Sequence, residues 1–170
     1  MYADVNYLSY ISKRSEKIKL KLRNKKDCIM KYKATCSCGS VEIELDNEPF
    51  QQLVCHCNNC RGWSAAPVTS ATLFQPEEVR ITKGSEHVKR YEQSEGHEKC
   101  WCEKCGGHLM NDHTKGYGFK DVYGALIQNF SFTPTAHINY ESSILQIKDG
   151  LPKFKDFPSD FGGSGELLDE

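Results

Sequence analysis

Three short cysteine motifs dominate this sequence: Cys36-Ser37-Cys38-Gly39, Cys55-His56-Cys57-Asn58-Asn59-Cys60 and Cys100-Trp101-Cys102-Glu103-Lys104-Cys105. Together they hold eight of the nine cysteines in 170 residues. Residues two apart on a strand share a face, and the tight turn of a Cys-x-x-Cys unit also aims two sulfurs at one point. An odd cysteine count without a secretory segment fits a disulfide framework poorly. The motifs therefore predict metal sites. Zinc is the default, because it prefers soft thiolates in a tetrahedral arrangement.

Eight thiols can build two closed four-sulfur sites, or seven can build one closed site and one three-sulfur site with a vacant position. A closed site is structural, whereas an open one can bind substrate. Glycines follow Cys38 and Cys105, where a positive φ lets backbone N–H groups approach the sulfurs. The matched Cys-x-Cys and Cys-x-x-Cys pairs favour a closed site of Cys36, Cys38, Cys102 and Cys105. Cys100 either supplies a fourth sulfur to the remaining trio, or is a spectator one strand period before Cys102.

Charge is distributed unevenly along the chain. The first 30 residues hold eight Lys or Arg and three acidic residues, whereas the remainder holds 14 basic and 20 acidic residues. An acidic body argues against a nucleic-acid footprint there, so any polyanion affinity belongs to the N-terminal arm. No apolar run approaches the roughly 18 residues of a membrane span, and no secretory segment is visible. We therefore expect a cytoplasmic protein.

The chain divides into three predicted parts. Residues 1–29 form a basic extension that is either disordered or upstream of a start at Met30, with a mitochondrial transit peptide as the weaker alternative. Cys28 lies alone in this extension and is expected to be a packed thiol. Residues 30–158 form the folded domain, and residues 159–170 form an acidic, flexible tail.

Short strands broken by turns fill the predicted domain. The expected class is mainly β with little helix. One short helix is expected at 58–64 and a helical turn at 76–79. Candidate strands cover 31–36, 40–46, 51–55, 68–74, 79–82, 87–93, 98–102, 119–127 and 135–140.

The three cysteine blocks resemble those of the glutathione-dependent formaldehyde-activating enzyme (GFA) family, also called the CENP-V/GFA domain. Their order and spacing match over residues 30–158, and later segments agree: His137-Ile138 and Asp149-Gly150-Leu151-Pro152. The resemblance implies a mainly β, Mss4-like fold stitched together by two zinc ions. It also implies a structural zinc on Cys36, Cys38, Cys102 and Cys105, and an open, catalytic zinc on Cys55, Cys57 and Cys60. Lys99 and Trp101 occupy places where family members often have an Arg and another aromatic residue.

The family reaction joins glutathione to formaldehyde, so the resemblance implies a carbon–sulfur lyase with glutathione and a small aldehyde as substrates. Zinc with three thiolates can take the glutathione sulfur as its fourth ligand, which activates the thiol beside the aldehyde. A non-catalytic glutathione or thiol carrier is one alternative. A zinc-stabilised interaction module with a basic arm is another. The sequence does not indicate the oligomeric state.

Five further side chains near the motifs have competing interpretations. Arg61 either binds glutathione and offsets the negative charge of the thiolates, or is a surface residue of the short helix. His56 is expected to pack or to support the ligands, because its side chain should point away from the converging sulfurs. His108 and His113 are expected to be loop residues rather than ligands. Trp63 either lines a substrate cleft or packs in the core.

Overall fold

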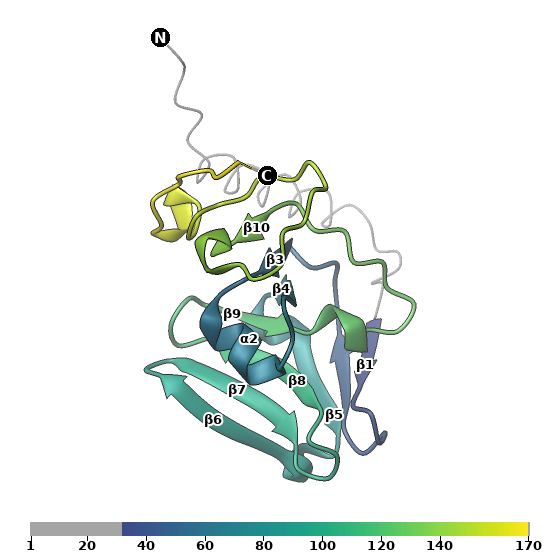
Figure 1. Ribbon diagram of the computed structural model, residues 1–170. Coiled ribbons are helices and arrows are strands. Elements are labelled where there is room, and N and C mark those ends of the chain that lie inside the picture. The colour runs from purple at the N-terminus through teal and green to yellow at the C-terminus, as the bar shows by residue number, and fades with distance from the viewer. Residues whose placement is uncertain (1–31, 170) are drawn as a thin grey trace.

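The computed structural model describes residues 32–169, and within that range the fold is mainly β (Figure 1). Strands hold 38% of these described residues and helical segments 16%, which confirms the predicted fold class. The predicted extension 1–29, with Cys28, lies outside the described residues. No helix within residues 32–169 is long and apolar enough to cross a membrane.

Two sheets build the fold. The smaller has the order β1-β2-β5, antiparallel throughout, with bounds Tyr32–Thr35, Glu42–Leu45 and Val79–Lys83. The larger has the order β10-β3-β4-β9-β8-β7-β6, and only the β10–β3 pair is parallel. Its bounds are β3 Gln51–Cys55, β4 Thr69–Phe74, β6 Val88–Ser94, β7 His97–Cys102, β8 His108–His113, β9 Phe119–Val122 and β10 His137–Ile138.

The α-helix α2, Asn58–Ser64, lies in front of the larger sheet in Figure 1. Cys57 caps its N-terminus, and Ala65 caps its C-terminus with a left-handed backbone conformation. Single turns of 3-10 helix connect other elements: Pro76–Glu78, Ser85–His87, Gly124–Leu126, Tyr140–Ser142 and Ser159–Phe161.

Each face of the larger sheet has its own hydrophobic cluster. One face packs against the small sheet, and this core includes Ile43, Phe74, Cys100, Met110 and Val122. The other face carries a second cluster with Leu53, Leu73 and Ile138, against which Cys57 and Cys60 pack. Side chains alternate along strands, so residues adjacent in sequence serve the two clusters in turn.

The predicted elements match with three differences. The helix at 58–64 and the turn at 76–78 are present, but β8 at 108–113 was not predicted. The predicted strand 119–127 ends at Val122, because Gly124–Leu126 forms a 3-10 turn. The predicted strand 135–140 shrinks to His137–Ile138, since Tyr140–Ser142 also turns.

The C-terminal segment folds back on itself beyond the predicted boundary at 158. Leu167 forms a bridge with Phe154, and the Leu168 N–H donates to the Lys153 carbonyl at 2.8 Å. Lys155 also pairs with Glu166 at 2.9 Å. These contacts arrange residues 159–168 along 153–157, while the flexibility of this tail in solution stays a prediction.

Candidate functional site

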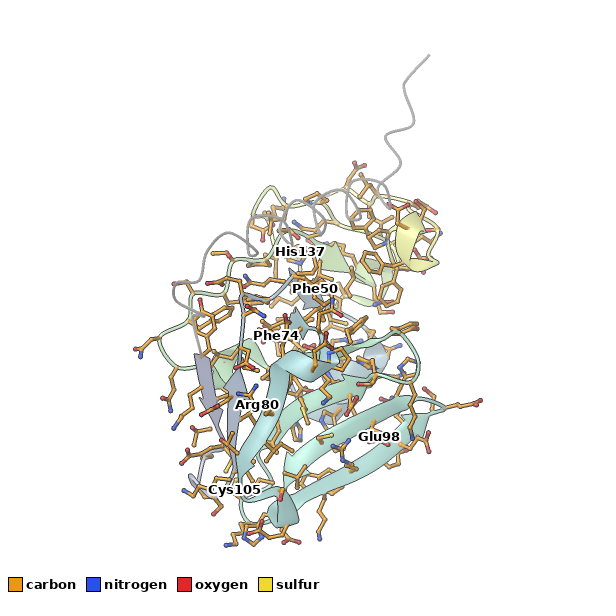
Figure 2. The ribbon with its side chains drawn as sticks, turned by 180° about the vertical axis from the view of Figure 1, so that it is seen from behind. Phe50, Phe74, Arg80, Glu98, Cys105 and His137 are labelled. Carbon is orange, nitrogen blue, oxygen red and sulfur yellow. The ribbon has the colours of Figure 1, made fainter. Side chains whose placement is uncertain are left out.

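Four cysteines from two distant segments meet where the small sheet adjoins β7. The sulfurs of Cys36, Cys38, Cys102 and Cys105 all lie within 4.8 Å of one another. Cys36 and Cys38 come from the turn between β1 and β2, whereas Cys102 ends β7 and Cys105 lies in the turn before β8. Figure 2 labels Cys105 at one end of the molecule, opposite His137. We call this group the four-cysteine cluster.

The turns of this cluster present backbone N–H groups to its sulfurs. Gly39 and Gly106 both have positive φ, near +70°, as the sequence predicted. The Val41 N–H donates to Cys36 Sγ at 3.2 Å. Hydrogen bonds from Ser40 lower the pKa of the Cys38 thiol to about 6. The turn after Cys38 therefore favours its thiolate, the form in which cysteine binds a metal, whereas burial raises the pKa of the Cys102 thiol to about 11.

Three cysteines form a second group on the opposite face of the larger sheet. The sulfurs of Cys55, at the end of β3, and of Cys57 and Cys60, at the start of α2, lie within 4.8 Å of one another. Within residues 32–169, no further His, Cys, Asp or Glu ligand atom joins this group. We call it the cysteine trio. Each cluster can hold a metal ion, and the second offers only three ligands.

Each sulfur of the trio has a hydrogen-bond donor from a different source. The Cys60 N–H donates to Cys57 Sγ at 3.2 Å, as part of the helix cap. Lys99 Nζ lies 3.6 Å from Cys60 Sγ, and Asn139 Nδ2 lies 3.9 Å from Cys55 Sγ. Outer partners of this kind orient metal ligands and tune their basicity. Each sulfur therefore has a donor that stabilises its deprotonated form.

The three thiols do not share charge equally. Hydrogen bonds from Cys55 and Cys60 hold the pKa of the Cys57 thiol far below its ordinary value. The pKa of the Cys55 thiol is raised by its hydrogen bonds to Cys57 and Cys60 and by burial. The first negative charge of the trio therefore settles on Cys57, the N-cap of α2, where the helix dipole also favours an anion.

Lys99 is a functional candidate to which the sequence analysis gave no role, although it occupies a place where the family often has an Arg. Its side chain is only 4% exposed, although lysine is rarely buried without a partner. Strand alternation puts Cys100 and Cys102 in the core on one face and Lys99 on the other, beneath α2. The sequence signal for this position is that Lys99 precedes Cys100 and Cys102, which share one face of a strand, so Lys99 must lie on the other face.

His56 packs away from the sulfurs in a chain of buried polar groups. Its Nε2 lies 2.8 Å from His137 Nδ1, and His137 Nε2 lies 2.9 Å from Asp149. Asp149 also pairs with the buried Lys153 at 2.6 Å. Burial, helped by His137, lowers the pKa of His56 to about 4, so its ring is neutral at pH 7. This chain ties the C-terminal segment to the backbone between Cys55 and Cys57.

Arg61 fastens α2 to the turn at 140–142. Its Nε donates to the His56 carbonyl and its Nη2 to the Ser142 carbonyl, both at 2.9 Å. These bonds fix the position of the loop that carries the trio. Its predicted contact with glutathione stays a prediction.

Trp63 both packs and lines a groove. Its ring stacks on His108 at 4.6 Å and on Tyr91 at 6.3 Å between centroids. The groove, of about 300 Å³, runs between α2 and β6. Its walls are Asn58, Asn59, Gly62, Trp63, Tyr91 and Gln93.

The remaining sequence candidates lie outside both clusters. His108 and His113 belong to β8 rather than to a loop, which corrects the sequence expectation. His113 Nδ1 lies 2.8 Å from His97 Nδ1, and neither ring joins a ligand group. Cys100 is fully buried in the core against the small sheet, so it is the spectator of the two alternatives.

Comparison with known proteins agrees with this arrangement. A crystal structure of a Rhodobacter sphaeroides protein superposes with a TM-score of 0.50 at 23% sequence identity, covering 58% of this chain and 90% of that one. That likeness supports the fold. The family model described as glutathione-dependent formaldehyde-activating enzyme matches residues 31–142, which include both cysteine clusters. The chain therefore belongs to the glutathione-dependent formaldehyde-activating enzyme family.

Proposed function

We propose that this protein is a zinc-dependent carbon–sulfur lyase that adds glutathione to formaldehyde or a related small electrophile at the cysteine trio. The observation that carries the proposal is the trio itself, a converging group of three thiols with no fourth protein ligand among the described residues. Three protein ligands and a position for substrate are typical of catalytic zinc sites. Family membership supplies the substrate class.

The two clusters fit zinc in different roles. Cys36, Cys38, Cys102 and Cys105 provide the four thiolates of a closed structural site. Cys55, Cys57 and Cys60 provide three thiolates, each with its own hydrogen-bond donor, and leave one position for a ligand. Zinc, when bound there, lowers the pKa of an arriving thiol and polarises it as a Lewis acid.

The proposed reaction conserves its atoms without a further co-reactant. The glutathione sulfur forms a bond to the formaldehyde carbon, the carbon–oxygen π bond breaks, and the proton released by the thiol ends on the oxygen. The chain contributes by fixing the position of the thiol, since a bimolecular addition becomes an addition at one place. The Arg61 bonds and the polar chain through His56 hold that place rigid.

The groove beside α2 suits the rest of the glutathione molecule. Its walls offer amide groups from Asn58, Asn59 and Gln93 between the rings of Trp63 and Tyr91. Peptide groups need such donors and acceptors when they leave water. We assign this groove, with Arg61, as the candidate glutathione subsite.

We also propose a cell compartment for the protein and bounds for its active unit. Reduced thiols at two clusters require a reducing compartment, so we place the protein in the cytoplasm. The active unit is residues 30–158, with the extension 1–29 and the tail 159–170 outside it.

Exchange NMR tests the proposed function. Labelled formaldehyde and glutathione interconvert slowly with their adduct, and exchange cross-peaks report the rate. The zinc-loaded protein is expected to raise this rate in proportion to its concentration, whereas Cys57→Ser at equal concentration is expected not to. Glutathione binding without a faster exchange would favour the thiol carrier instead.

A further inference from the structure

The open trio poses an electrostatic problem that rests on the proposed function. Zn²⁺ with three thiolates has a net charge of −1, and a thiolate as fourth ligand makes it −2. Burying such a charge is costly unless an opposite charge lies close by. A neutral fourth ligand, such as an imidazole, leaves the charge at −1. A fixed cation beside the trio would therefore stabilise one kind of ligand more than the other.

Lys99 is positioned to provide that cation. Its Nζ lies 3.6 Å from Cys60 Sγ, and its side chain is almost entirely out of water. Water therefore screens the charge weakly, and its interaction with the trio is stronger than that of a surface lysine. Arg61, the cation that the sequence suggested, instead donates to two backbone carbonyls.

Two polar side chains lie beside Lys99 on the same face of the sheet, one on each of the next two strands. The backbone register pairs Lys99 with Asn111, and Asn111 with Asp121. Asn111 Nδ2 donates to Asp121 at 2.7 Å, and the Thr72 N–H donates to the same carboxyl at 2.8 Å. All three side chains of the row are buried. The row extends from β7 to β9 beneath α2 and gives Lys99 polar surroundings.

We propose that Lys99 is a specificity-determining residue that makes the open position of the trio selective for anionic ligands, thiolates above neutral ones. The fixed charge offsets the extra negative charge that a thiolate brings. Affinity for a neutral ligand does not depend on that offset. The selectivity is a property of this chain's own charge arrangement and does not depend on turnover.

Two small probes separate charge from shape. 2-Mercaptoethanol binds zinc as a thiolate and has no other charge, whereas imidazole binds as a neutral ligand. Their affinities are measured by calorimetry on the zinc-loaded full chain, with metal content checked first. Lys99→Met keeps the length of the side chain without its charge, and Lys99→Arg keeps the charge. Lys115→Ala is the matched control, because it removes an exposed lysine that lies outside the trio.

Lys99→Met is expected to weaken 2-mercaptoethanol binding by about tenfold or more, the scale of a unit charge a few ångströms away in a partly buried site. Imidazole binding is expected to stay unchanged. Lys99→Arg should retain most of the selectivity, and Lys115→Ala should behave as wild type. Equal weakening of both probes, or of neither, would overturn the proposal.

Metal retention provides the safeguard for the neutral variant. If Lys99→Met releases the second zinc, Lys99→Gln takes its place in the same comparison. Loss of the second zinc from both neutral variants, with zinc retained in Lys99→Arg, would overturn the proposed selectivity. The lysine charge would then be needed to hold zinc on the three cysteines and not to select the fourth ligand. Wild-type protein that binds 2-mercaptoethanol but not glutathione would contradict the proposed function and leave this inference standing.

Discussion

Cys57 has two structural roles that one substitution can separate. Its sulfur belongs to the trio and also caps α2 by accepting from the Cys60 N–H. Serine is among the best N-cap residues but is a poor zinc ligand at neutral pH. Cys57→Ser is therefore expected to lose one of two zinc ions and glutathione binding, with an unchanged circular dichroism spectrum. Metal analysis of the purified variant measures the loss, and collapse of the whole fold would contradict the assignment.

Cys100→Ser is the matched control for that experiment. The thiol is fully buried in the core and belongs to neither cluster. Both zinc ions should remain, while burying a hydroxyl in place of a thiol costs about 1–3 kcal/mol of unfolding free energy. Loss of a zinc ion from this variant would mean that Cys100 is a ligand.

Asp121 gives the protein a pH-dependent stability. Burial raises the pKa of this carboxyl to about 7, from an ordinary value of 3.8. Between these values the folded chain binds more protons than the unfolded chain. The free energy of unfolding that protonated Asp121 contributes is therefore lost as pH rises from about 4 to about 7. Asp121→Asn removes this loss. The unfolding free energy of Asp121→Asn minus that of wild type should therefore grow as pH rises, by at most about 4 kcal/mol, and should level off above pH 7.

Urea denaturation of both chains at pH 6, 7 and 8, with zinc in excess, measures this difference. Comparing the chains at each pH cancels the pH dependence of zinc binding itself. A difference that stays constant from pH 6 to 8 would show that Asp121 does not titrate in this window.

At the residue scale, motif spacing and the following glycines favoured the four-cysteine grouping, and the family resemblance implied the division of seven cysteines into four and three, while spacing left the role of Cys100 open. The structure brings the same sulfurs together. Lys99 could not be identified in this way. Its burial depends on Asn111 and Asp121 from two other strands, and a lysine within a strand normally reaches water.

At the scale of elements, the turn that follows β5 supports the turn that carries Cys38. Gly84 and Gly39 both have positive φ, so alanine at either position costs about 1–2 kcal/mol of backbone strain. A Cβ at Gly84 would also overlap the Ser40 carbonyl, whereas a Cβ at Gly39 would meet nothing within 4 Å. Gly84→Ala should lower the melting temperature more than Gly39→Ala and should weaken zinc retention at the four-cysteine cluster. Equal shifts in thermal melts would contradict this close contact.

The strand β8 shows why one element was not predicted. Leu109, Met110 and Asn111 are buried in succession, because β8 lies inside the sheet and both of its faces are covered. Such a strand lacks the polar–apolar alternation of β2, in which the buried Ile43 and Leu45 alternate with Glu42 and Glu44. Buried Asn111 further hides the pattern, since its amide is satisfied by Asp121 from another strand. By contrast, the helix expected at 58–64 is present with those bounds as α2.

On the scale of the whole molecule, the four-cysteine cluster joins the small sheet to the larger one. A structural zinc site is worth about 10–16 kcal/mol, as much as the whole stability of a typical domain. Cys102 is fully buried in this cluster, so Cys102→Ser is expected to leave the chain unfolded or without a cooperative melting transition. Heteronuclear NMR of the variant checks this. A well-dispersed spectrum would assign the cluster a minor role.

The arrangement of the two sheets was beyond the sequence argument. Strand order places β10 beside β3 in parallel and β9 beside β4, pairings between segments far apart in the chain. Short strands without regular hairpin signals leave such pairings open. The cysteine motifs supplied the long-range information that strand patterns lacked, because a shared site requires residues 36–38 and 102–105 to meet.

Native mass spectrometry of the purified chain, with and without glutathione, tests the central claim most directly. Wild-type protein should contain two zinc ions and bind one glutathione, whereas Cys57→Ser should contain one zinc ion and bind none. Cys100→Ser should behave as wild type. Two zinc ions with no glutathione bound, or glutathione bound equally by Cys57→Ser, would contradict glutathione binding at a zinc ion held by the cysteine trio.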